Sequence, residues 1–277
     1  MVSPRTLVEV WSEDVVRVVC ARPSDLEDHF DLALRIRGAL GGALSVAGPV
    51  LGARPDPAHR PNAFELLYGS LPPRRQGEPL MGRPMAIDAD VIGDEVHVEV
   101  RLFGGSGFWL EQVRDGLLAA LEDGVALRPS GQRVPFSPLT CTTCRIVPEP
   151  APSRVGEAVL TFLTPLAIRS GSRPSAAPGA LLSALQARMA GLAPWQGVTL
   201  AFSAMDARAA AAALHVEAEA WRPIAFRRFS RRAPGAPIPV MGFCGRLRLT
   251  GALDPIGPLL HLARRTHLGS NAALGLG

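Results

Sequence analysis

A series of strand and helix patterns that occurs twice along the chain constrains its fold more than any other feature of the sequence. In the first half, residues 85–92 and 95–102 lie on either side of Gly93-Asp94, and residues 96–102 alternate apolar and polar side chains. Alternation around such a turn predicts a β-hairpin. The other elements predicted in this half are strands at 6–11 and 15–21 (or one bent strand over both), a helix at 28–44, a helix at 110–121 and a strand at 140–147.

The second half begins after a proline-rich linker at residues 148–152, which read Pro-Glu-Pro-Ala-Pro. The first half has the order βαββαβ, which is that of a ferredoxin-like fold. A strand at 158–168 starts a second series. We therefore predict an α+β protein of two tandem ferredoxin-like (RRM-like) βαββαβ domains, at residues 1–148 and 155–277. The other elements expected in the second domain are a helix at 181–192, an alanine-rich helix at 205–214, strands at 215–221 and 242–249 and a short helix at 256–263.

Positive charge is concentrated near the C-terminus. Between Arg222 and Arg265 there are nine arginines and one acid, Asp254, which is a local net charge of +8. The whole chain carries +4, so the remainder carries −4. All 29 basic residues are arginine, and the planar guanidinium group binds two phosphate oxygens at once. This charge asymmetry favours a polyanionic partner such as a nucleic acid. It argues against the alternative that the glycines near the C-terminus form the loop of a small-molecule enzyme.

Other compositional features limit the class of protein. No apolar run reaches the roughly 18 residues of a membrane helix, and acids interrupt the N-terminus where a secretory signal would be apolar. A cytoplasmic protein without a membrane partner is expected. The pair Cys141 and Cys144 has zinc-ligand spacing, but no second pair follows, so neither a metal nor another cofactor is expected.

The C-terminal segment carries a spacing of glycines that resembles a known loop. It reads His267-Leu268-Gly269, then residues 270–274, then Gly275-Leu276-Gly277. This resembles the glycine-rich loop of RAMP-superfamily proteins, in particular the CRISPR precursor-RNA processing endoribonucleases. His267 stands where that family has its first glycine, and Asn271 stands where a lysine is common. Upstream, Trp221 and residues 228–232 and 241–245 are similar to the family's Trp…Arg-Tyr-Ser-x-Arg…Gly-Gly-x-x-Gly block.

The resemblance implies a reaction. Family members cleave CRISPR repeat RNA, which folds as a hairpin, without a metal: a neighbouring 2′-hydroxyl attacks the scissile phosphate and the 5′-oxygen leaves. This chemistry needs a base, an acid and positive charge near the phosphate. The resemblance also leaves open retention of the product in a complex with other CRISPR effector subunits. The alternative within the same fold is a non-catalytic RAMP subunit that binds guide RNA.

Histidine is the side chain best suited to such acid–base work, because its pKa lies near neutral pH. His59 lies in a proline-rich loop, at the place where the resemblance puts a catalytic histidine in several relatives. A solvent-exposed loop histidine without a role is an equally good interpretation. His29, at the predicted start of a helix, and Tyr68, the single tyrosine, are the further catalytic candidates.

The candidates for RNA contact lie in the C-terminal basic segment, in the following strand and in the glycine-rich segment. A solvated basic face is the alternative for the arginines, but the aromatic Phe229 among them favours contact with RNA. The RNA-binding candidates are Arg227, Arg228, Arg231, Arg232, Arg246, Arg248, His267, Gly269, Ser270, Asn271, Gly275 and Gly277.

Overall fold

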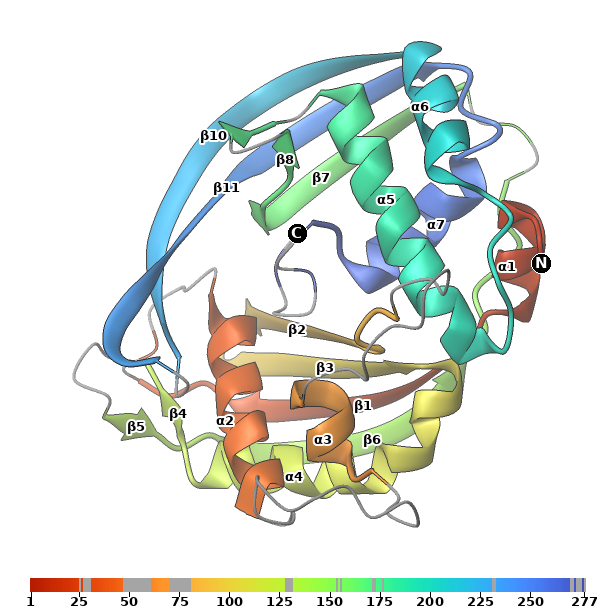
Figure 1. Ribbon diagram of the computed structural model, residues 1–277. Helices are drawn as coiled ribbons and strands as arrows, with labels where there is room; N and C mark the ends of the chain where they lie inside the picture. Colours follow the sequence, from red (N-terminus) through yellow and green to blue (C-terminus); the bar gives the residue numbers. More distant parts are fainter. Residues whose placement is uncertain are drawn as a thin grey trace.

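The protein is an α+β protein with two main antiparallel sheets, each with helices packed on one face, and two further two-stranded sheets, β4-β5 and β8-β9 (Figure 1). No helix within the part of the chain that the structure describes is both long and apolar enough to cross a bilayer. The computed structural model describes residues 1–24, 26, 31–46, 61–69, 81–127, 132–152, 154, 156–170, 173–175, 177–230, 233–269, 272 and 276.

The first sheet has the strand order β2-β3-β1-β6, which is the order of a ferredoxin-like fold. Its central pair, β1 and β3, is antiparallel with Val16 opposite Val100. The turn at Gly93, where φ is +60°, joins β2 to β3 as the sequence predicts. The bounds are β1 Glu13–Ala21, α2 Leu32–Val46, α3 Ala63–Tyr68, β2 Met85–Ile92, β3 Glu95–Phe103, a 3-10 helix Gly104–Trp109, α4 Leu110–Glu122, β4 Val125–Ala126, β5 Arg133–Val134 and β6 Ser137–Ile146.

Alternation along β3 places its valines on the face that α2 and α4 cover. Val96, Val98 and Val100 are buried there and pack against Leu40 and Leu117 of the two helices. The polar residues of β3 point to the opposite face, which is turned toward the second half of the molecule. The first sheet therefore has an apolar face and a polar face, and the polar one forms part of the site described below.

The second sheet has the order β10-β11-β7, and α5 and α7 cover its apolar face. Leu247 and Leu249 of β11 are fully buried, whereas Arg246 and Arg248 lie on the other face, as the alternation predicts. The bounds are β7 Glu157–Leu166, β8 Arg169–Ser170, β9 Arg173–Pro174, α5 Pro178–Leu192, a 3-10 helix Ala193–Gln196, α6 Ala204–Ala212, β10 Leu214–Ser230, β11 Ala233–Gly251 and α7 Gly257–Thr266.

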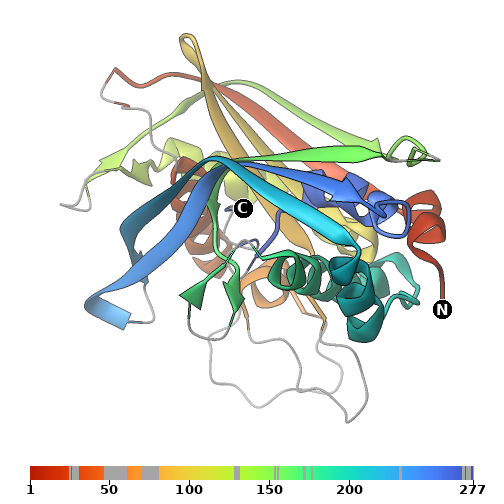
Figure 2. The same cartoon turned by 90° about the horizontal axis from the view of Figure 1, so that it is seen from above.

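The strands β10 and β11 form a hairpin that extends well beyond the end of β7 (Figures 1 and 2). A register shift lies where Ala220, with φ of +48°, meets Gly245, with φ of +136°. A bulge of this kind strengthens the local twist and bends the ribbon. The far part of the hairpin therefore curves away from the sheet, and it carries the segment around Arg227 and Arg228.

The strand predicted at residues 6–11 is wrong: the segment forms helix α1, Pro4–Val10. The Ser3 side chain caps the helix by accepting a hydrogen bond from the Thr6 amide, and Pro4 occupies the first turn, where no amide hydrogen is needed. Leu7 and Trp11 then pack into the apolar core of the second half. The domain division at residues 148 and 155 stays a prediction. Helix α1 belongs to the first predicted domain in sequence, but it packs on the core of the second half.

Candidate functional site

A cleft of about 620 Å³ lies between the two halves of the molecule. Residues 88–91 of β2 and 159–164 of β7 line it from opposite sides. Both are edge strands of their sheets, so each presents backbone groups that no neighbouring strand pairs within the described residues. Leu32 at the start of α2, Arg264 at the end of α7, and His267 complete much of the wall.

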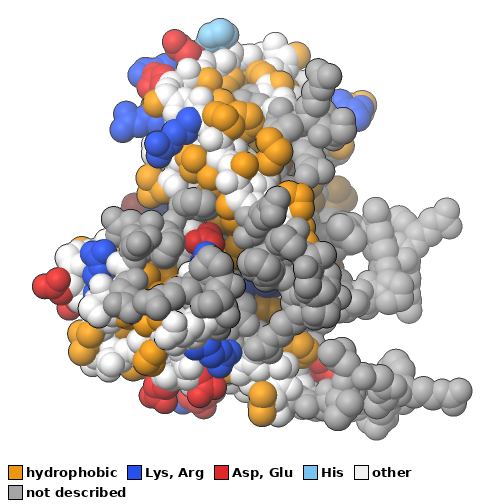
Figure 3. All heavy atoms as spheres, turned by 90° about the vertical axis from the view of Figure 1, so that its left-hand side faces the viewer, with side chains coloured by type: hydrophobic (Ala, Val, Ile, Leu, Met, Phe, Trp, Pro, Cys, Tyr) orange, Lys and Arg blue, Asp and Glu red, His pale blue; other side chains and the backbone are white. Residues whose placement is uncertain are grey.

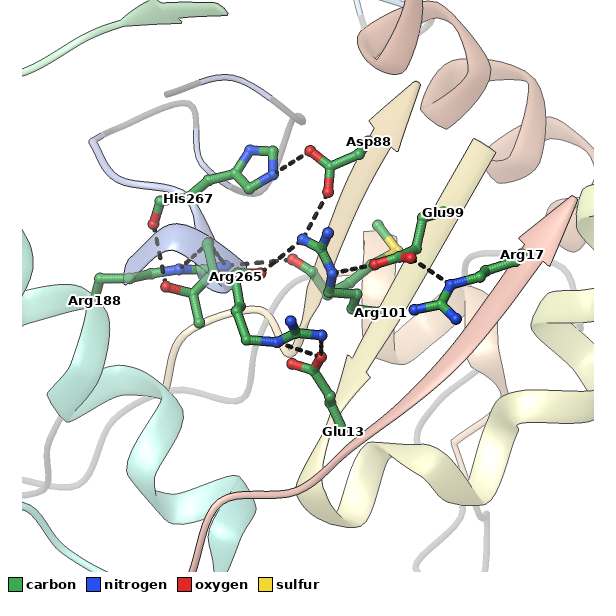
Figure 4. Close-up of polar contacts among 10 residues, drawn as sticks. Glu13, Arg17, Asp88, Glu99, Arg101, Arg188, Arg265 and His267 are labelled. Atoms are coloured by element: carbon green, nitrogen blue, oxygen red, sulfur yellow. Dashed lines mark hydrogen bonds and ion pairs between the residues drawn. The ribbon is translucent and has the colours of Figure 1, made fainter. Parts of the chain in front are cut away.

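A polar network borders this cleft on the side of the first sheet. His267 Nε2 lies 2.9 Å from Asp88 Oδ1, and the Arg101 guanidinium lies 2.6 Å from Asp88 Oδ2 (Figure 4). Burial raises the pKa of Asp88, but the hydrogen bond from His267 and the charge of Arg101 outweigh it, so that this pKa lies below its usual value. Asp88 is therefore an ionised acceptor, and His267 Nε2 carries the proton that it donates.

The network continues along the polar face of β3. Arg101 Nε donates to Glu99 at 2.5 Å, and Arg17 of β1 donates to the same carboxylate at 2.6 Å. Burial raises the pKa of Glu99, but Arg101 and Arg17 lower it by more, so the carboxylate stays charged. Arg101 also donates to the backbone carbonyl of Arg265 at 3.0 Å. The polar face of the first sheet is thus joined to the end of α7.

Two arginines of the second half hold the same region. Arg188 of α5 donates two hydrogen bonds to the backbone carbonyl of Thr266, at 2.8 and 3.0 Å. It also donates to the backbone carbonyls of Arg83, at 3.2 Å, and Met85, at 3.3 Å. Burial lowers the pKa of Arg188 to about 10, so it stays charged at neutral pH. Arg265 forms an ion pair with Glu13 of β1. These contacts fix the end of α7 against the first sheet.

The predicted RNA-binding arginines differ in whether their side chains already form ion pairs within the protein. Arg246 is exposed, with no hydrogen bond or ion pair to any described residue. Arg248 forms ion pairs with Glu157 and with Glu219, the second at 2.9 Å, so a phosphate competes with two carboxylates there. Figure 3 shows arginine side chains gathered on one face of the second half, with hydrophobic side chains beside them.

The basic segment of the hairpin is described in part. The backbones of Arg227 and Arg228 lie in β10, opposite Pro239 and Ile238 of β11. Arg231 and Arg232 lie outside the described residues.

The glycine-rich segment begins where α7 ends. Gly269 has φ of +85°, and a β-carbon there would lie 2.7 Å from the carbonyl oxygen of Ala167, so glycine is required on both counts. Leu268, Ala272 and Leu276 are buried, which seats the segment against the body of the molecule. Ser270, Asn271, Gly275 and Gly277 lie outside the described residues.

Of the predicted catalytic residues, Tyr68 alone is described. Its hydroxyl donates to the carbonyl of Arg37 at 2.8 Å, and the Arg37 guanidinium lies 4.5 Å from the ring centroid. Burial raises the pKa of Tyr68 to about 12, against the lowering effect of Arg37 and Arg83. His59 and His29 lie outside the described residues. The three catalytic assignments therefore stay predictions.

Sequence reasoning missed three charged residues of the cleft. Arg264 is exposed and lines the cleft without an ion pair to any described residue, and Asp88 and Asp90 line it from β2. Two arginines in the last turn of a helix beside the glycine-rich segment were a usable signal for Arg264. Asp88 and Asp90 gave no comparable sequence signal, because polar side chains on the solvent-facing side of a strand are common in any sheet.

Within the described ranges, no three side chains of His, Cys, Asp or Glu gather closely enough to hold a metal ion. Cys141 and Cys144 lie on the edge strand β6, where Cys141 is exposed and both are free thiols. Residues at i and i+3 of a strand point to opposite faces, so these two thiols do not converge on one ligand.

The antiparallel sheets with helices on one face, the arginines of the long hairpin and the glycine that follows α7 agree with the resemblance to RAMP-superfamily proteins. Residues 160–277 match the family model of the CRISPR-associated endoribonuclease Cas6. The resemblance predicted from the C-terminal motifs is confirmed by this match, which covers all of them.

Solved Cas6 structures share the fold over nearly the whole chain. Thermus thermophilus Cas6 (TTHB231) is 16% identical with a TM-score of 0.55, over 96% of this chain and 97% of that chain. The product complex of Cas6 (TTHA0078) is 17% identical with a TM-score of 0.57, over 96% and 97%. At these identities the likeness establishes the fold. No curated protein sequence matches the chain.

Proposed function

We propose that this protein is an endoribonuclease that cleaves CRISPR repeat RNA to guide RNA. The observation that carries the proposal is the match of residues 160–277 to the Cas6 endoribonuclease family. The similar fold of Cas6 proteins solved as product complexes supports it. The excess of arginine in the same segment supports a nucleic acid as the partner, because phosphate contacts supply much of the affinity for RNA.

The proposed reaction is metal-independent transesterification. The 2′-oxygen of the nucleotide before the cut attacks the scissile phosphorus and loses its proton to a base. The bond to the 5′-oxygen breaks, and that oxygen takes a proton from an acid. The products carry a 2′,3′-cyclic phosphate and a 5′-hydroxyl, so no water or external reactant is consumed. A positioned acid–base group contributes roughly 10²–10⁴ in rate.

His59, His29 and Tyr68 remain the proposed acid–base groups. Leu32, which stands three residues after His29 in the sequence, lines the cleft. Pro61, two residues after His59, accepts a hydrogen bond at 3.0 Å from Trp109, which is not among the cleft residues. His29 and His59 themselves lie outside the described residues, so both remain proposals, with His59 the first choice from the sequence. The hydroxyl of Tyr68 is engaged with a backbone carbonyl, which supports a structural role in the free protein.

RNA contact is proposed on two surfaces. Arg264 lines the cleft beside the glycine-rich segment, and it is free of described ion pairs. The hairpin carries Arg227 and Arg228 in β10, with Arg231 and Arg232 next along the chain. A hairpin RNA that lies across both surfaces places its single-stranded part in the cleft, and the backbone edges of β2 and β7 offer hydrogen-bonding groups to it.

The second candidate function is a non-catalytic subunit that binds guide RNA, retained with other CRISPR effector subunits. The observation that favours it is Asn271, which stands where the resembling loop commonly has a lysine. A loss of positive charge at that place weakens both phosphate binding and transition-state stabilisation.

A single-turnover cleavage assay separates the two functions. Wild-type protein, His29→Ala, His59→Ala and the double variant are mixed in excess with labelled repeat RNA. A fall of about 10²-fold or more in rate, with affinity kept, identifies the acid–base histidine. Full activity of the double variant rules out catalysis by these two histidines. Tight binding of RNA that the wild-type protein leaves intact supports the guide-binding subunit.

A further inference from the structure

His267 has a backbone conformation that belongs to glycine. Its φ is +59° and its ψ is 162°. This region of backbone space is essentially restricted to glycine, because a β-carbon meets neighbouring backbone atoms there. Among the described residues, Ala220 is the other non-glycine with positive φ, at +48°. A histidine persists at position 267 only if its surroundings hold it there.

The side chain of His267 supplies such a hold. It is 7% exposed, and its Nε2 donates to Asp88 of β2 at 2.9 Å, a bond between residues 179 apart in the chain. Figure 4 shows the ring and the carboxylate pointing toward each other across the boundary between the halves. Arg101, 2.6 Å from the same carboxylate, fixes the acceptor in turn. A charge-assisted hydrogen bond at a partly buried place is among the stronger contacts of its kind.

The two residues before His267 are held to neighbouring elements through their carbonyls. The carbonyl of Arg265 accepts from Arg101, and the carbonyl of Thr266 accepts twice from Arg188, which also binds the start of β2. His267 is the last of these three consecutive anchors. Two residues later, Gly269 approaches the carbonyl of Ala167 beyond the end of β7. The glycine-rich segment thus leaves α7 from a point fixed to both halves.

We propose that His267 is a positioning residue. Its bond to Asp88 pins the start of the glycine-rich segment to β2, in a backbone conformation that the side chain itself disfavours, and so sets where the segment meets RNA. The inference rests on the proposed function and assigns no acid–base role to this histidine. The ring is buried, and its Nε2–H group is already engaged in the hydrogen bond to Asp88. The imidazole is therefore not placed to exchange protons with the 2′-oxygen or the 5′-oxygen at a scissile phosphate.

The test compares substitutions that separate the pin from the strain. His267→Ala removes the bond and keeps a β-carbon in the disfavoured conformation. His267→Gly removes the bond and also the strain, and His267→Gln keeps an N–H donor for Asp88. Asp88→Ala is made in the wild-type and His267→Gly backgrounds as a double-mutant cycle. His97→Ala is the matched control, since His97 and Glu95 form a pair of similar length, 2.8 Å, on the exposed surface.

Three quantities are measured for each variant that shows a cooperative thermal transition: the Kd for repeat RNA, the single-turnover rate at saturating protein, and hydrogen exchange of residues 268–276 without RNA. We expect His267→Ala to raise Kd about tenfold and to speed exchange. The cleavage rate should stay within about threefold, because the lost group positions the RNA-binding segment. His267→Gln and His267→Gly should stay within about threefold of wild type in Kd. Asp88→Ala should raise Kd about tenfold in the wild-type background and far less beside His267→Gly.

Unchanged exchange and Kd in His267→Ala overturn the proposal, as does an equal effect of Asp88→Ala in both backgrounds. A fall in cleavage rate at saturation, with Kd unchanged, overturns it in favour of a catalytic role. If the wild-type protein binds no repeat RNA, the proposed function fails. The pin is then judged by hydrogen exchange alone, where faster exchange in His267→Ala but not in His97→Ala supports it.

Discussion

Arg265, in the last turn of α7, forms an ion pair with Glu13, the first residue of β1, 252 positions away in the chain. The Glu13 side chain is fully buried, and Arg265 Nε donates to its Oε1 at 2.6 Å. A buried carboxylate depends on its partner, because an unpaired charge away from water is costly. This pair therefore joins the polar face of the first sheet to the helix that leads into the glycine-rich segment.

The first prediction follows from that pair. Arg265→Ala leaves the Glu13 carboxylate buried without its cation, and we expect the free energy of unfolding to fall by about 3–5 kcal/mol. Urea unfolding followed by circular dichroism measures it. Arg114→Ala is the control, because Arg114 pairs with Glu111 and Asp115 on an exposed helix surface, where such pairs contribute about 0–1 kcal/mol. Equal losses in the two variants contradict the account.

The second prediction concerns acid. The pKa of Asp88 is lowered in the folded protein, since its bonds to His267 and Arg101 outweigh burial. A carboxylate of this kind stabilises the fold above its unfolded pKa of about 3.9, and that contribution is lost as pH falls through the folded value. The difference in unfolding free energy between wild type and Asp88→Asn should be full at pH 6 and shrink below about pH 4. Asp94→Asn, in the exposed hairpin turn, controls for the loss of a carboxylate; a gap that widens in acid argues against the assignment.

The third prediction concerns Gly269, where φ is +85° and the Ala167 carbonyl oxygen leaves no room for a β-carbon. Gly269→Ala should destabilise the protein by about 1–3 kcal/mol and weaken RNA binding. Gly179→Ala is the matched control: a β-carbon there meets nothing within 4 Å, and the residue lies in α5. The control should be neutral or slightly stabilising. Melting temperatures and RNA affinity measured for both variants decide the matter, and a neutral Gly269→Ala refutes the prediction.

The fourth prediction concerns the arginines of the hairpin. Each phosphate contact contributes roughly 0.7–0.9 to the slope of log affinity against log salt. Reversal of Arg228 and Arg231 to glutamate should lower the affinity for repeat RNA and flatten that slope by more than one unit. Arg248→Glu should have a smaller effect on the slope, because this arginine already pairs with Glu157 and Glu219. An unchanged slope in the double variant means that the hairpin segment does not contact phosphates.

Much of the fold was readable because strand alternation is a local signal. Val96, Val98 and Val100 alternate with polar residues, and the sheet buries all three valines. Helix α1 was wrongly predicted as a strand because seven residues are too few for its buried residues, Leu7 and Val8, to repeat at the helical period. Its apolar face packs on the second half, which is distant in the sequence. Local pattern carries little information about such a partner.

The site was less readable, because its contacts join residues far apart in the chain. The excess of arginine near the C-terminus indicated a basic surface, yet Arg248 and Arg265 are neutralised by acids that lie elsewhere in the sequence. The replacement of a glycine by His267 was visible as a departure from the resembling pattern. The carboxylate of Asp88 that holds this histidine became apparent only in three dimensions.

The measurement that tests the central claim most directly is cleavage of a repeat RNA with a single modified nucleotide. Excess protein in EDTA is mixed with all-ribose repeat RNA, and with the same RNA carrying 2′-deoxyribose just 5′ of the cut. Intramolecular attack without a metal predicts cleavage of the first RNA to a 5′-hydroxyl fragment, and none of the second at that position. Cleavage of the deoxy-substituted RNA at the same bond, or loss of all cleavage in EDTA, contradicts the proposed mechanism. Binding of both RNAs without cleavage of either contradicts the enzyme and leaves the guide-binding subunit.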